Sequence, residues 1–173
     1  MKDILLRKLR YELTLAQRKS TLKILILCPY SPLEAKERLK DIKGYLGSRG
    51  YTNTKLVEDF SPGKELTDKE IFLKSRDKIN NWADILFFFF LKEALNESKL
   101  MGVQDEVTIV CEDADKVSKS VIFIDDKIKT EISKQFKGRL KNYEFKLVSP
   151  SSQVDTKKAA FTYAFKFLKE LLR

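Results

Sequence analysis

The sequence predicts a doubly wound α/β fold with three layers and a five-stranded parallel sheet. Five apolar or alternating runs are separated by segments of helical periodicity, near 22–28, 52–58, 84–91, 120–125 and 142–148. The first, third and fourth are continuously apolar, as in strands buried on both faces, whereas the second is polar and the fifth alternates. The two weaker runs are expected at the sheet edges. The simplest right-handed order is then 2-1-3-4-5, a flavodoxin-like arrangement, with a ligand crevice between strands one and three.

The segments between these runs carry helix signals. Apolar stripes at helical spacing are formed by Ala35, Leu39, Ile42 and Leu46, by Ile128, Ile132 and Phe136, and by Val154, Phe161, Phe165, Leu168 and Leu172. Gly50, as a left-handed cap, and Gly138 are expected to end the first two helices. Thr67 and Glu70 form a capping box that predicts the start of the helix before strand three.

Residues 107–111 leave two alternatives open. Their sequence, Val-Thr-Ile-Val-Cys, is β-prone and is compatible with a sixth strand. A parallel connection between strands three and four needs a crossover, however, and no other segment can supply its helix. We therefore expect 107–111 to end a helix that begins near Ser98.

The first twenty residues lie outside the alternating pattern, so we divide the chain into an N-terminal helix, 1–20, and a single α/β domain, 21–173. The helix combines an apolar stripe with many basic residues: Ile4, Leu5, Leu9, Leu13 and Ala16 beside Lys2, Arg7, Lys8, Arg10, Arg18 and Lys19. We expect it to dock on its own domain or on a twofold-related copy in a homodimer. Contact with a membrane surface or with nucleic acid is the alternative.

Composition limits the classes of function. The 173 residues include no histidine, which excludes Ser/His/Asp and Cys/His mechanisms and leaves carboxylates, hydroxyls, thiols or lysines. The two cysteines have no metal-ligand or redox spacing, and neither a GxGxxG motif nor a P-loop is present, so no metal or cofactor is expected. The net charge of +9 invites a polyanion, but interleaved acidic residues favour a solvated surface over a nucleic-acid face. We expect a reduced, cytoplasmic protein without a transmembrane segment.

Strand one runs into a loop that contains Tyr30 and Ser31 between two prolines. These side chains are candidates for contacting a ligand at the carboxyl end of the strand. The alternative is that the prolines simply make a turn.

Glu106 is the candidate catalytic residue. On a helix it shares a face with Val103 and Val110, so its carboxyl would be partly desolvated. Desolvation raises the pKa of a carboxyl and favours a nucleophilic or acid/base role. The alternative is that Glu106 points outward and pairs with Lys99 or another nearby base.

Three segments together resemble the nucleoside 2-deoxyribosyltransferase-like and Toll/interleukin-receptor-like group, over roughly 22–125. They are the first strand-loop-helix unit, which begins at Lys23, the unit Ile71–Leu91 with Ser75-Arg76-Asp77-Lys78-Ile79 and Ala83-Asp84-Ile85, and Gly102-Val103-Gln104-Asp105-Glu106. In these families a helix after the third strand carries a glutamate that acts at the anomeric carbon of a ribosyl group, and Glu106 matches that position. Its surroundings depart from the transferase pattern, which has a glycine/threonine turn there.

The resemblance implies a domain that acts on the N-glycosidic bond of a nucleoside or nucleotide. Glu106 would be the key carboxylate, a role that needs no histidine. Tyr30 and Ser31 would shape the pocket, Arg38 or Arg76 would meet phosphate, and Asp84 or Asp105 would assist. A non-catalytic nucleotide-sensing or protein-interaction module is the second reading and a basic nucleic-acid-associated protein the third, and the fold alone does not choose among them.

Overall fold

A computed structural model of the protein describes residues 2–29, 31–97, 100–132 and 134–172. Its sheet has five parallel strands in the order β2-β1-β3-β4-β5, which confirms the predicted order. The strands are β1 (Ile24–Leu27), β2 (Thr54–Leu56), β3 (Ile85–Phe90), β4 (Ser120–Ile124) and β5 (Lys146–Val148). The three apolar runs are the central strands and are buried at every residue, because each has a neighbour on both sides and a helical layer on both faces.

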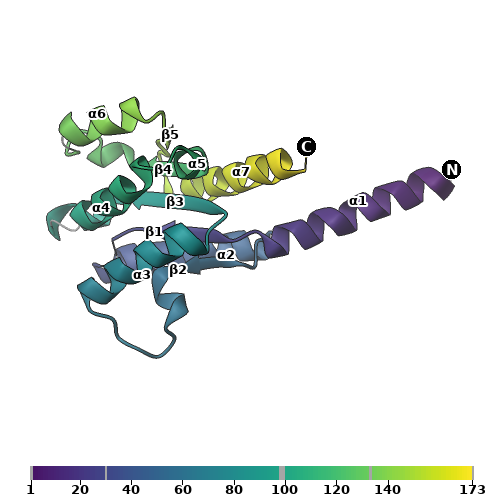
Figure 1. Ribbon diagram of the computed structural model, residues 1–173, viewed down its shortest axis with the longest axis horizontal. Coiled ribbons are helices and arrows are strands. Elements are labelled where there is room, and N and C mark those ends of the chain that lie inside the picture. Colours follow the sequence, from purple (N-terminus) through teal and green to yellow (C-terminus); the bar gives the residue numbers. More distant parts are fainter. Residues whose placement is uncertain (1, 30, 98–99, 133, 173) are drawn as a thin grey trace.

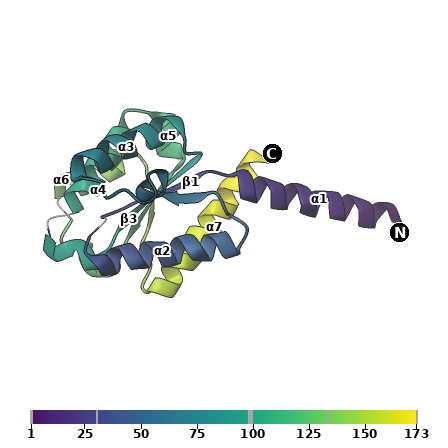
Figure 2. The same ribbon diagram turned by 90° about the horizontal axis from the view of Figure 1, so that it is seen from below.

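Helices cover both faces of the sheet (Figures 1 and 2). On one face pack α2 (Leu33–Ser48) and α7 (Gln153–Leu171), and on the other α3 (Asp68–Asn81), α4 (Leu100–Cys111), α5 (Ala114–Ser118) and α6 (Lys134–Asn142). Three short 3-10 helices, η1 (Val57–Phe60), η2 (Lys92–Glu97) and η3 (Asp126–Ile128), follow β2, β3 and β4. Each face therefore has its own hydrophobic core, and the sheet separates the two.

The helix signals upstream of β4 are confirmed. The predicted apolar stripe of α2 is buried, and Gly50 follows with a φ of 96°. Thr67 and Glu70 form the capping box of α3, where the Thr67 hydroxyl accepts from the Glu70 N–H. Residues 107–111 are helical and complete α4, so the crossover requirement outweighed their β propensity.

The expected helix from Ile128 to Gly138 is wrong in its bounds. Ile128 ends η3, whereas α6 begins at Lys134 and continues through Gly138 to Asn142. The three apolar residues are spaced four apart, and this spacing arises both in one continuous helix and in a short 3-10 helix followed by a separate α-helix. All three side chains pack in the same core. The left-handed residue that follows the end of α6 is Glu144, with a φ of 54°.

The expected apolar face of α7 is rotated in the structure. Val154 is 54 % exposed, and the side chains that face the sheet are Thr156, Ala160, Ala164, Phe167 and Leu168. The two alanines suit this position because they let the helix approach the large rings of β3 and β4 closely. The stripe of the largest residues is therefore only partly right: Leu168 is buried as predicted and Phe161 is partly buried, but the centre of the buried face lies at the two alanines. In β5, likewise, an apolar residue of the alternating run is not buried, since Leu147 is 49 % exposed.

The N-terminal helix α1 (Lys2–Thr21) projects from the domain as a separate rod (Figures 1 and 2). Within 11–21, only Leu15 and Lys19 are partly buried, and the Lys19 ammonium lies 5.7 Å from the centre of the Tyr51 ring. Leu13 is 64 % exposed. The expectation that the apolar stripe docks on its own domain is therefore wrong for Leu13 and Ala16, the two stripe residues within 11–21. Over the parts of the chain that the structure describes, no helix is long and apolar enough to span a membrane.

Candidate functional site

A cavity of about 250 Å³ lies at the carboxyl end of β1, beside the point where the strand order reverses. Three segments form its wall: Cys28, Pro29 and Ser31 after β1, Asp68, Ile71 and Phe72 in the first turns of α3, and Gly102, Val103 and Glu106 on α4. Parallel α/β sheets bind ligands at this place, because strand ends and helix starts converge there. The cavity therefore lies where the sequence predicts a ligand.

Glu106 is buried, with 4 % of its surface exposed, although it lines the cavity. The alternative in which it points outward to pair with a base is therefore wrong. Burial raises the pKa of Glu106 to about 8, a nearby Ser75 hydroxyl partly offsets this effect, and the charge of Asp105 adds to it. Neither Glu106 Oε2 nor Ser75 Oγ has a hydrogen-bond partner of regular geometry among the described residues. A buried polar atom without a partner costs about 1–3 kcal/mol, so Glu106 Oε2, which belongs to a residue of the cavity wall, is suited to receive a ligand or water.

The Cys28 thiol lies in the same wall and is also buried. Burial raises the pKa of Cys28 well above its ordinary value, and the negative charges of Glu106 and Glu58 add to the effect. The thiol therefore stays protonated at neutral pH, as does the carboxyl. At this pH the inner wall presents neutral hydrogen-bonding groups instead of charges.

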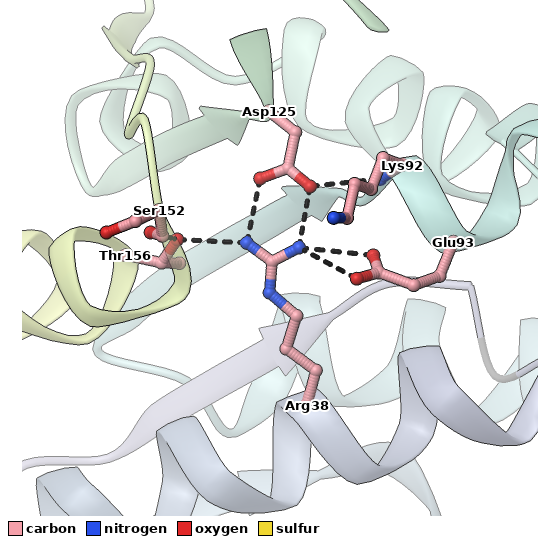
Figure 3. Close-up of polar contacts among 6 residues, drawn as sticks. All are labelled: Arg38, Lys92, Glu93, Asp125, Ser152 and Thr156. Carbon is pink, nitrogen blue, oxygen red and sulfur yellow. Dashed lines mark hydrogen bonds and ion pairs between the residues drawn. The ribbon is translucent and has the colours of Figure 1, made fainter. Parts of the chain in front are cut away.

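Arg38 does not line this cavity. It lies on α2 and is held in a buried cluster shown in Figure 3. Its two terminal nitrogens donate to Asp125 at 2.6 and 2.8 Å, and they also donate to Glu93 at 3.1 Å and to the Thr156 hydroxyl at 3.0 Å. Burial by itself would lower the pKa of Arg38, but the hydrogen bonds and charges of Asp125 and Glu93 raise it. The guanidinium therefore has a structural role, in which it links α2 to η2, to the end of β4 and to α7.

Asp125→Ala is expected to lower the free energy of unfolding by about 3 kcal/mol, because it leaves the buried Arg38 charge with Glu93 alone and removes the acceptor of the Lys92 N–H. Urea denaturation measures the change. The matched control is Asp126→Ala, which removes an exposed carboxylate paired with Lys129 and should change the same quantity by less than about 0.5 kcal/mol. Equal losses in the two variants would contradict a structural role for the cluster.

The other expected binding residues are dispersed. Ser31 lines the cavity, whereas Arg76 is exposed on α3 and does not. Asp84 lies at the amino end of β3, at the opposite edge of the sheet, where its carboxylate accepts from the Lys23 N–H at 2.9 Å. Asp105 is exposed on the side of α4 away from the cavity. Tyr30 lies outside the described residues.

Of the wall residues, sequence reasoning assigned only Ser31 and Glu106 to the site, and it missed the others, among them Cys28, Asp68, Phe72 and Gly102. The sequence did indicate which segments would form the wall. A parallel sheet binds ligands at the carboxyl ends of its strands, and the end of β1 and the first turns of α3 and α4 all lie at that edge. Which side chains of those turns face inward depends on helix rotation, which no pattern in this chain specifies.

Nothing in the described part of the chain gathers three or more cysteine, aspartate or glutamate side chains in a group that could hold a metal ion. The described site thus has one buried carboxyl, Glu106, one exposed carboxylate, Asp68, one buried thiol and one serine in a mainly apolar wall. Comparison of the chain with protein-family models, with curated proteins and with solved structures gives no match.

Proposed function

We propose that the cavity binds a nucleoside or nucleotide and that Glu106 acts on its N-glycosidic bond. The observation that supports this most directly is the buried carboxyl of Glu106, which lines a cavity at the strand-order reversal and whose Oε2 has no hydrogen-bond partner of regular geometry among the described residues. Carboxyl groups whose pKa is strongly perturbed and which lie in a concave site are frequent in acid/base catalysis. The size of the cavity suits the sugar or the base at the scissile bond, and the rest of a larger ligand such as a dinucleotide would lie outside it.

The chemistry follows from the protonation state. With a pKa of about 8, Glu106 is protonated at neutral pH and can donate its proton to the leaving base as the bond from the anomeric carbon to nitrogen breaks. The bonding electron pair leaves with the base. The carboxylate that remains stabilises the oxocarbenium-like centre or captures it, and water then adds to the anomeric carbon and returns a proton to Glu106.

The test is release of the base from common nucleosides and from nicotinamide dinucleotide at millimolar concentration, followed by chromatography. We expect turnover or, at the least, saturable binding measured by calorimetry. If the purified protein neither binds nor cleaves any of these compounds, the proposal is wrong.

Gly102→Leu supplies a site-specific arm of this test. Among the described residues, no atom lies within 4 Å of a Cβ built at Gly102, so the added side chain can occupy the mouth of the cavity without disturbing α4. We expect ligand binding to weaken by about tenfold or more. The matched control is Gly138→Leu in α6, which also has open space around it, is exposed and lies away from the cavity. Equal ligand binding by the two variants would place the ligand elsewhere.

A non-catalytic ligand-binding module is the second candidate. The observation in its favour is that, in the described wall, Glu106 is the one buried carboxyl and Asp68 is exposed at the rim. Glycoside hydrolysis commonly uses two carboxyl groups. Saturable binding without base release, lost in Gly102→Leu but not in Gly138→Leu, would support this reading.

A further inference from the structure

The helix α1 has an exposed apolar side that the domain does not cover. Leu13 and Leu15 are two residues apart and therefore lie on nearly opposite sides of the helix. Leu15 contacts the core near the base of α1, whereas Leu13 is 64 % exposed and Ala16 is exposed on the same side as Leu13. The sequence periodicity assigns Leu5 and Leu9 to this side as well.

A helix in this position needs a partner. Isolated helices gain little stability from hydrogen bonding alone, and most helices in proteins are stabilised by packing of their apolar face. α1 has 20 residues, and within 11–21 its contacts with the domain are confined to the last two turns. The partner must accept both the apolar side and the charges that flank it.

The charge of α1 distinguishes among partners. The helix has six basic residues, Lys2, Arg7, Lys8, Arg10, Arg18 and Lys19, and two acidic ones, Asp3 and Glu12. A second copy of α1 would bring the same excess of positive charge to the contact. Nucleic acid would use the basic residues but would leave the apolar side in water. A lipid surface that contains anionic headgroups satisfies both features, since the leucines enter the interface and the basic side chains meet the phosphates and carboxylates.

We propose that α1 binds, lying in the plane of the interface, to membranes that contain anionic lipid. This inference is independent of the ligand in the cavity. Figures 1 and 2 show that α1 extends well clear of the domain, so most of its length can lie on a surface without a clash.

The test is co-sedimentation of the full chain with phosphatidylcholine vesicles and with vesicles in which part of this lipid is replaced by phosphatidylserine. We expect binding to the mixed vesicles that weakens as salt is added, and little binding to phosphatidylcholine alone. Circular dichroism should show an unchanged or higher helix content on binding. Absence of binding to the mixed vesicles would overturn the proposal.

Two pairs of variants separate the apolar and the charged contributions. Leu13→Glu should reduce binding by roughly tenfold or more, whereas Leu73→Glu, which changes a leucine that is 54 % exposed on α3, should leave it unchanged. Arg10→Gln with Arg18→Gln should also reduce binding by roughly tenfold or more, whereas Lys134→Gln with Lys137→Gln on α6 should not.

The rival partners give different results in the same set of proteins. A dimer in light scattering that Leu13→Glu dissociates, together with no vesicle binding, would assign the apolar side to a second copy. Binding to a DNA duplex that the arginine pair weakens and Leu13→Glu does not, again without vesicle binding, would assign the charges to nucleic acid. Either result would overturn the lipid proposal.

Discussion

Glu106→Gln is expected to reduce turnover of an N-ribosyl substrate by about three orders of magnitude. Glutamine keeps the shape of the side chain but can neither donate the proton to the leaving base nor leave a carboxylate beside the ribosyl cation. Both contributions exist only in the transition state, so turnover should fall while substrate affinity changes little. Steady-state kinetics with the best substrate from the screen, at neutral pH, separates the two quantities.

Asp105→Asn is the matched control for this variant. It removes a carboxylate from the adjacent position of α4, but that side chain is exposed and does not line the cavity. We expect turnover close to that of the unmodified protein. If Glu106→Gln and Asp105→Asn retain equal turnover, Glu106 is not the catalytic residue.

The pH dependence of stability is the second large effect expected at Glu106. The folded protein keeps this carboxyl protonated up to a pKa of about 8, whereas the unfolded chain releases the proton near the ordinary value of 4.5. Between these values the folded state holds a proton that the unfolded state has lost, so stability falls as pH rises. The stabilisation that comes from this bound proton is fully present below pH 4.5. Between pH 4.5 and pH 8 it decreases by about 1.4 kcal/mol per pH unit, and above pH 8 the free energy of unfolding no longer changes through this group. In total, roughly 5 kcal/mol should be lost across these 3.5 pH units.

Glu106→Gln removes this dependence because an amide does not titrate. Urea denaturation of both proteins between pH 5 and pH 9 should therefore show the variant gaining stability relative to the unmodified protein as pH rises. Parallel curves for the two proteins over this range would show that the carboxyl is ionised in the folded state, and the acid role in the proposed reaction would fail with it.

The strand order and the burial of Glu106 could be predicted because both depend on local patterns. Runs such as Ile85–Phe90 reveal that a strand is covered on both faces, and the valines one turn either side of Glu106 reveal which side of α4 is buried. The position of Asp84 was also open to prediction, since a residue that precedes a strand lies at its amino end, away from the ligand edge of the sheet.

The role of Arg38 could not be predicted in the same way. Its partner Asp125 is 87 residues away in sequence, and only the packing of α2 against the end of β4 brings the two together. The sequence alone does not distinguish an arginine that binds the phosphate of a ligand from one that neutralises a buried aspartate, because the charge is the same in both. The projection of α1 is a similar case, because an amphipathic pattern shows that a helix has an apolar side but not what covers it.

The two outer strands have a consequence for how this protein meets other chains. β2 and β5 are each three residues long, and β5 begins with Lys146. Such short edges, one of them with a charged residue, offer few backbone groups to an incoming strand. The protein is therefore guarded against strand addition and the sheet-to-sheet aggregation that follows from it, although its central strands are among the most apolar segments of the sequence.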